Sequence, residues 1–282
     1  GSGADGISKG PYALIDEAYV LDPARPLIPQ VELDTDAVAL PLGELRLRLR
    51  HLALSGASAA GRSVPGAPVT LHIAHSWGGG IWRWIEDFIA GDSDGVNLIL
   101  MSDGDRAGEF CGQGLKLFVG GIGVGLIRDI PLSPHIVSTV ARHRQYQGVV
   151  TELIERYGVG RIIVSSLIGH SLECLETGLP TIQVLHDFYP VWPLLDFDPR
   201  PFIDEKQGLR RSRALAQHGD TLRMRPRDAQ FWNRIAAEWR RSAKKQDVRL
   251  VAPATHVIER WQAMNPDAAL KIAEIPHAFR PF

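Results

Sequence analysis

The chain has 282 residues, of which 45% are hydrophobic and 22% are charged, and its 31 basic side chains nearly balance its 32 acidic ones. This composition is typical of a globular protein with one large or two small domains, and it excludes collagen-like, disordered and disulfide-stapled classes. No stretch reaches the roughly 18 consecutive apolar residues of a membrane span, and the first residues lack the pattern of a signal peptide. We therefore expect a cytoplasmic protein. With only Cys111 and Cys174 and no C-x-x-C pattern, the sequence predicts no metal site.

Residues 1–68 differ in character from the rest of the chain. They alternate weakly between polar and apolar residues and are rich in Pro, Gly and Ala, which favours edge strands followed by a loose linker. We interpret them as a lead-in segment. Residues 69–282 are expected to form one Rossmann-like domain.

Apolar runs alternate with amphipathic stretches from residue 69 onward. Strands are predicted at 69–76, 97–103, 115–132 (interrupted by glycines), 161–166, 181–187, 248–254 and 271–277. Helices are predicted at 81–91, 135–158 (ended by Gly158), 171–178 and 255–265. This alternation indicates an α/β fold with a mainly parallel sheet covered by helices on both faces. In such sheets ligands bind at the carboxyl ends of the strands.

The first candidate site follows the first strand. Trp77 precedes three consecutive glycines, Gly78, Gly79 and Gly80, and then a helix begins. Glycines let the backbone approach a ligand closely, and a helix N-terminus offers unpaired N–H groups to a phosphate. The dinucleotide fingerprint G-x-G-x-x-G fails here, because Arg83 stands where the third glycine is needed. A tight glycine turn without a ligand is the structural alternative.

The second candidate site follows the strand at 181–187. His186 and Asp187 emerge there into a loop limited by Pro190. An imidazole at a strand end can donate a hydrogen bond to a substrate hydroxyl or a leaving group, and an adjacent acid can set its tautomer. A histidine held in the turn for structural reasons is the alternative.

Ser165, Ser166 and His170 form a third cluster past a strand end. We expect Ser166 and His170 to face the same cleft as the other two clusters. A Ser-His hydrolase is a poor fit, because the chain lacks a G-x-S-x-G elbow and helix capping explains the serines.

The segment 206–249 is strongly basic, with thirteen Lys or Arg against four Asp or Glu. Phe231, Trp232 and Trp239 recur in it at helical spacing. Such a segment can contact phosphates or an anionic membrane surface. The alternative, a solvated helix face docked on the domain through its aromatic residues, is the commoner arrangement.

Four stretches, in this order and spacing, resemble the amino-terminal domain of bacterial retaining glycosyltransferases of family 4: VTLHIAHSWGGGIWRWIEDF, IIVSSLIGHSLECLETGLPTIQVLHDFYPVWP, VRLVAPATHVIERW and IPH. The resemblance runs from about Val69 to His277. It implies one Rossmann-like half of a GT-B fold. It also implies that the three glycines lie near the sugar-nucleotide diphosphate and the acceptor, with His186 near the transferred sugar.

The resemblance implies an enzyme that transfers a sugar from a nucleotide-sugar donor to a polysaccharide or lipid-linked saccharide. This chain would bind the acceptor, and a donor-binding domain would follow Phe282, so we expect the chain to be inactive alone. We expect no tightly bound cofactor, no metal and no nucleic-acid partner, and a peripheral contact with the inner membrane through 206–249. A non-catalytic sugar- or phosphate-binding module of the same fold is the alternative, and another Rossmann-like enzyme is a third.

Overall fold

The computed structural model describes residues 68–276, apart from 78–79, 93–94, 105–111, 122–124, 205–207, 222–224, 227 and 246. Apart from Pro68, the expected lead-in segment lies outside the described residues, as do Gly78, Gly79 and Cys111. Every other candidate site residue is described.

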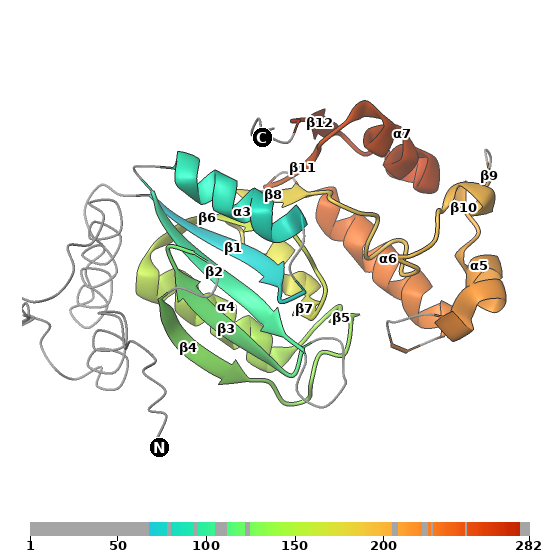
Figure 1. Cartoon of the computed structure of the whole chain (residues 1–282). Coiled ribbons are helices and arrows are strands. Elements are labelled where there is room, and N and C mark those ends of the chain that lie inside the picture. Colours follow the sequence, from blue (N-terminus) through green and yellow to red (C-terminus); the bar gives the residue numbers. More distant parts are fainter. Residues whose placement is uncertain are drawn as a thin grey trace, which may run out of the picture.

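A sheet of eight strands forms the centre of the fold, in the order β12-β11-β8-β6-β1-β2-β3-β4 (Figure 1). The six strands from β12 to β2 run parallel, while β3 and β4 are antiparallel additions at one edge. This confirms the predicted α/β class with a mainly parallel sheet. The strands are β1 (Val69–His75), β2 (Val96–Asp103), β3 (Gly114–Val119), β4 (Leu126–Pro131), β6 (Val159–Val164), β8 (Thr181–Val184), β11 (Val248–Ala252) and β12 (Ile272–Glu274).

Helices cover both faces of the sheet, as the apolar strand runs require. All seven residues of β1 are buried, which demands protein on each side of the strand. Helix α3 (Gly80–Gly91) packs Ile81 and Ile85 into a small cluster with residues of β1, β2 and β3. Helices α4 (Arg144–Tyr157), α6 (Ala229–Ala243) and α7 (Thr255–Met264) contribute to a separate, larger core.

Shorter elements complete the described chain. They are α5 (Arg211–His218), the 3-10 helices η1 (Leu172–Leu175), η2 (Arg200–Phe202), η3 (Gly219–Thr221) and η4 (Pro266–Ala268), and two small sheets, β5 (Thr139–Val140) with β7 (His170–Ser171) and β9 (Ile203–Asp204) with β10 (Gly208–Leu209).

Two predicted helices are shorter in the structure. The one expected at 135–158 starts only at Arg144, because Thr139 and Val140 pair in parallel with β7 and His143 caps the helix by accepting a hydrogen bond from the Tyr146 N–H. Its predicted end at Gly158 is confirmed, with a left-handed φ of 63°. The helix expected at 171–178 is the single 3-10 turn η1.

The serines before this turn were assigned a capping role that the structure contradicts. The side chain that caps η1 belongs to Ser171, whose hydroxyl accepts from the Glu173 N–H. Ser165 and Ser166 precede a loop, so the helix N-terminus that would need them is not there.

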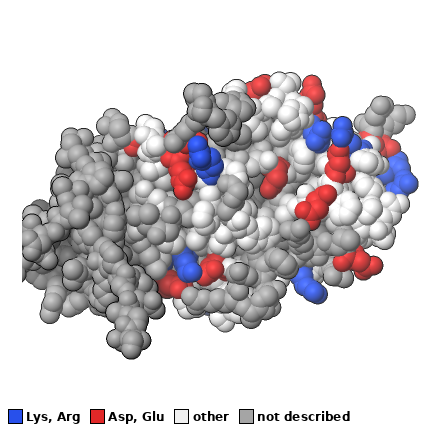
Figure 2. Space-filling model, in the orientation of Figure 1, with Lys and Arg blue, Asp and Glu red and all other residues white. Residues whose placement is uncertain are grey.

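The aromatic side of the basic segment faces the core of the protein. Trp232 and Trp239 on α6 are fully buried, so they are not available to enter a membrane. None of the described helices is both long and apolar enough to cross one. On the face shown in Figure 2, acidic and basic side chains lie interspersed among wide uncharged areas.

Candidate functional site at the strand ends

The order of the strands places a switch point between β1 and β6. From β1 the chain adds β2, β3 and β4 on one side of the sheet, and it later adds β6, β8, β11 and β12 on the other. Loops that leave two such strands diverge to opposite sides, which opens a crevice at their carboxyl ends. The residues after β1 and β6 are therefore the first place to look for a ligand site.

His75 and Trp77 lie at the end of β1. The His75 side chain is buried, and its Nδ1 atom has no hydrogen-bond partner among the residues that the structure describes. Burial lowers the pKa of His75, so the ring is neutral at physiological pH. The Trp77 ring stacks on it with centroids 5.2 Å apart and is itself 37% exposed. A neutral imidazole and an open indole face thus lie together at the switch point.

Ser165 lies at the end of the neighbouring strand β6, where its backbone N–H donates to the Ile73 carbonyl at 2.9 Å. Its hydroxyl is buried and, within the described part of the chain, has no hydrogen-bond partner. The Ser166 hydroxyl, by contrast, accepts from the Ile168 N–H at 3.1 Å. An unpaired buried hydroxyl is costly unless a ligand or water satisfies it. Ser165 is therefore the better candidate for contact with a ligand.

His170 has a structural role in the observed arrangement. It is fully buried, its Nδ1 lies 3.0 Å from the Tyr146 hydroxyl, and its Nε2 lies 2.7 Å from the Ala74 carbonyl. Burial lowers its pKa to about 4. Because both ring nitrogens already have partners, His170 ties its loop to the end of β1 and has no nitrogen left for a substrate.

His186 and Asp187 follow β8, the next strand beyond β6. The His186 ring meets the edge of Trp84, with centroids 5.4 Å apart, so helix α3 and the β8 loop are in contact. The Asp187 carboxylate accepts from the Tyr189 N–H at 2.9 Å. Its backbone carbonyl accepts from the Trp261 indole of α7 at 3.1 Å. The structure thus brings the first and second predicted sites to one edge of the sheet.

Asp187 is half-buried in the loop that follows β8. Burial raises the pKa of Asp187 to about 6, against the partly opposing hydrogen bond from Tyr189. A carboxyl group with this pKa exchanges its proton near neutral pH, as a general acid or base must. Its predicted role in orienting His186 stays a prediction.

Gly80 begins α3, and a Cβ atom built on it would have no atom within 4 Å. No described residue therefore fills the space in front of Gly80. Its N–H group belongs to the first turn of a twelve-residue helix, where backbone donors lack partners within the helix. The structure thus places Gly80, Trp77, His75, Ser165, His186 and Asp187 at the carboxyl ends of three adjacent strands, and we call this set the switch-point cluster.

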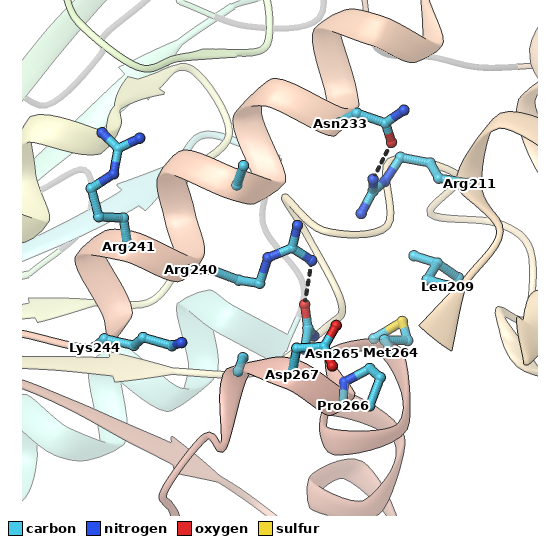
Figure 3. Close-up of a pocket in the computed structure, with 12 residues that line it drawn as sticks. Leu209, Arg211, Asn233, Arg240, Arg241, Lys244, Met264, Asn265, Pro266 and Asp267 are labelled. Carbon is cyan, nitrogen blue, oxygen red and sulfur yellow. Dashed lines mark hydrogen bonds between the residues drawn. The ribbon is translucent and has the colours of Figure 1, made fainter. Parts of the chain in front are cut away.

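Trp84 was missed by the sequence analysis. The available signal was its position in the first turns of the helix that follows the glycine loop, since that turn lies above the strand ends in this fold. A pocket of about 610 Å³ was also missed, and it lies elsewhere, between α6 and the turn after α7 (Figure 3). None of the predicted site residues lines it.

Comparisons with protein-family models, with curated proteins and with solved structures found no match. Among the described residues, no group of His, Cys, Asp and Glu side chains has an arrangement that could hold a metal ion.

Proposed function

We propose that this chain is the acceptor-binding half of a retaining glycosyltransferase. The enzyme would transfer a sugar from a nucleotide-sugar donor to a polysaccharide or a lipid-linked saccharide. The observation that carries the proposal is the switch-point cluster. There the exposed Trp77 indole stacks on His75, and the buried His75 Nδ1 and Ser165 hydroxyl at the ends of adjacent strands have no hydrogen-bond partner among the described residues. A pyranose presents C–H groups that pack on an aromatic face and hydroxyls that need hydrogen-bond partners. The Trp77 ring and the His75 and Ser165 side chains supply both.

The same cluster supports the chemistry of sugar transfer. When the bond to the nucleotide diphosphate breaks, negative charge develops on the leaving phosphate and positive charge on the sugar ring. Backbone N–H groups at the start of α3, with Gly80 among them, are positioned donors for such a phosphate. His186, held against Trp84, is placed to donate a hydrogen bond to the sugar or the leaving group.

The proposal divides the work between two domains. The half described here would hold the acceptor and the transferred sugar, and a second domain would hold the nucleotide. Asp187, with its pKa near 6, would orient His186 or take up a proton from the acceptor hydroxyl. No step requires a covalent bond between sugar and protein.

Saccharide binding tests the proposal without the donor domain. The protein is first probed on an array of bacterial surface oligosaccharides, and the strongest binder is titrated by calorimetry against two variants. Trp77→Ala removes the exposed indole and should weaken binding by at least about tenfold, which corresponds to roughly 1.4 kcal/mol. Leu126→Ala is the matched control, because Leu126 on β4 is 38% exposed and lies on an edge strand away from the cluster.

An equal loss in both variants, or no saccharide bound at all, would overturn the proposal. Sugar transfer from UDP-glucose or GDP-mannose by the complete gene product would support it further. Saccharide binding without transfer from any nucleotide sugar would instead favour the non-catalytic binding module.

A further inference from the structure

The pocket between α6 and the turn after α7 is rich in arginine. Its walls come from β10, the start of α5, one side of α6, and the end of α7 with η4. Figure 3 shows Arg211 beside Asn233 at one end and Arg240 reaching toward Asn265 in the middle. The volume of about 610 Å³ lies within the range of small-molecule sites, roughly 300–1,000 Å³. We call this site the arginine pocket.

Arg211 is a buried charge without an acidic partner. It is 5% exposed, and its guanidinium donates to the Val191 carbonyl at 2.7 Å and to the Asn233 amide oxygen at 2.5 Å. Both acceptors are neutral, and the described residues give Arg211 no ion pair. Burial, and then the nearby charge of Arg240, lower the pKa of Arg211 to about 10. A buried cation normally has a counter-charge, so this one indicates that an anion completes the site.

Arg240 repeats the pattern on α6. It is half-buried, and its Nη1 donates to the Asn265 amide oxygen at 3.2 Å. Burial lowers its pKa, and the carboxylate of Asp267 opposes that effect. Two guanidinium groups thus face one pocket, each bonded to an amide oxygen and not to a carboxylate.

The remaining lining residues include more basic than acidic side chains. Arg241 pairs with Glu238 at 2.7 Å and is exposed at the rim, as is Lys244. Asp267 is the one acidic residue in the lining, against four basic ones. Structural bonding accounts for Arg211, which fastens α5 to the loop at Val191 and to α6. It does not account for the presence of Arg240 and Lys244 around the same open volume.

The lining also has an apolar part. Leu209, Met264 and Pro266 form one wall of the pocket opposite α6. A bare ion would leave this wall unused, whereas a larger molecule would place its charged group on the arginines and its body on the apolar side chains. Guanidinium groups bind phosphate oxygens through paired hydrogen bonds, which makes a phosphate ester the best match.

We propose that the arginine pocket binds the phosphate group of a phosphate ester, with Arg211 and Arg240 as its ligands and Lys244 at its entrance. This site is separate from the switch-point cluster and does not rest on the proposed function. The ester is either a soluble metabolite or the headgroup of an anionic lipid, and both present the same chemistry to the arginines.

Calorimetric titration at constant ionic strength tests the site. The probes are inorganic phosphate, glycerol 3-phosphate, and vesicles of phosphatidylcholine with and without phosphatidylglycerol. The test variant is Arg240→Gln, which leaves the buried Arg211 in place and is checked for an unchanged melting temperature. Arg234→Gln is the matched control, because it removes the same charge from the exposed side of the same helix outside the pocket.

We expect the wild-type protein to bind glycerol 3-phosphate more tightly than inorganic phosphate, and Arg240→Gln to weaken binding by at least about tenfold. Arg234→Gln should leave binding unchanged. Binding to the anionic vesicles alone, lost in Arg240→Gln and kept in Arg234→Gln, identifies the lipid headgroup as the source. Failure of the wild-type protein to bind any probe, or an equal loss in both variants, would overturn the proposal.

Discussion

The switch-point cluster and the arginine pocket are incomplete in different ways. The cluster has buried polar atoms of His75 and Ser165 that lack hydrogen-bond partners in the described structure, but it carries little charge. In the pocket, the guanidiniums of Arg211 and Arg240 have hydrogen-bond partners but, among the described residues, no ion-pair partner. The first arrangement suits a neutral, hydroxyl-rich ligand, and the second suits an anion. A missing hydrogen bond and a missing counter-charge are therefore separate signals of ligand chemistry.

The largest expected effect concerns the carboxyl group of Asp187 in the cluster. The folded state raises the pKa of Asp187 to about 6 from the ordinary value of 3.8, so it holds the proton more tightly than the unfolded state does. The stabilisation from this proton is present below the unfolded pKa and is lost as the pH rises through about 6. Asp187→Asn keeps the oxygen that accepts from Tyr189 and removes the charge. At about pH 8 the variant should be more stable than wild type by as much as about 3 kcal/mol.

Urea unfolding over a range of pH measures this effect. The two proteins should converge at about pH 3.5, where the carboxyl group is protonated in the folded state and mostly protonated in the unfolded state. If the unfolding free energies of the two proteins differed by the same amount at every pH, folding would not raise the pKa of Asp187. The cluster would then lack a carboxyl group that titrates near neutral pH.

A smaller effect is expected for His186→Ala in the complete gene product. If the proposed function is correct, turnover should fall by at least about tenfold, roughly 1.4 kcal/mol of barrier, because the proposed hydrogen-bond donor to the sugar or leaving group is lost. Loss of the ring contact with Trp84 should itself lower the free energy of unfolding by about 0.5–1.5 kcal/mol. Initial rates and thermal melts are compared with those of His135→Ala, an exposed histidine outside the cluster. Unaltered turnover would remove His186 from the site.

The smallest effect is expected for Ser165→Ala. The Ser165 hydroxyl has no partner among the described residues, so its removal should change the free energy of unfolding by less than about 0.5 kcal/mol. Ser102→Ala is the control at the same edge of the sheet. The Ser102 hydroxyl donates to the Ile168 carbonyl at 2.7 Å, and its loss should cost about 1–2 kcal/mol. Equal losses in urea unfolding would mean that Ser165 has a protein partner after all.

Much of the fold could be predicted because its signals are local. The buried strands read as apolar runs, and Gly158 ends α4 as its position after an amphipathic stretch indicates. The residues at 135–143 were misassigned because their state depends on pairing with His170 and Ser171, which a local pattern does not record. Strand pairing, a tertiary contact, therefore replaced the helix that the apolar spacing of this segment predicts.

The two sites also differ in how far the sequence predicts them. The switch-point cluster could be located from sequence, because the fold itself sends strand ends to one edge. What could not be predicted there was the division of roles, with His170 bonded inward and Ser165 left without a partner. The arginine pocket draws on residues from Leu209 to Ala268, and in the sequence its arginines are indistinguishable from those of a solvated helix face.

The pairing of β1 with β6 also bears on the order in which the protein folds. Val69 pairs with Val159, and the His170 ring reaches back to a carbonyl 96 positions earlier in the chain. Contacts between such distant segments form slowly, because a long loop must close before they stabilise anything. During synthesis β1 can pair with β2, but its other edge stays unpaired until β6 has left the ribosome. The edge that we propose to bind sugars is therefore completed only late in folding, after the chain has reached His170.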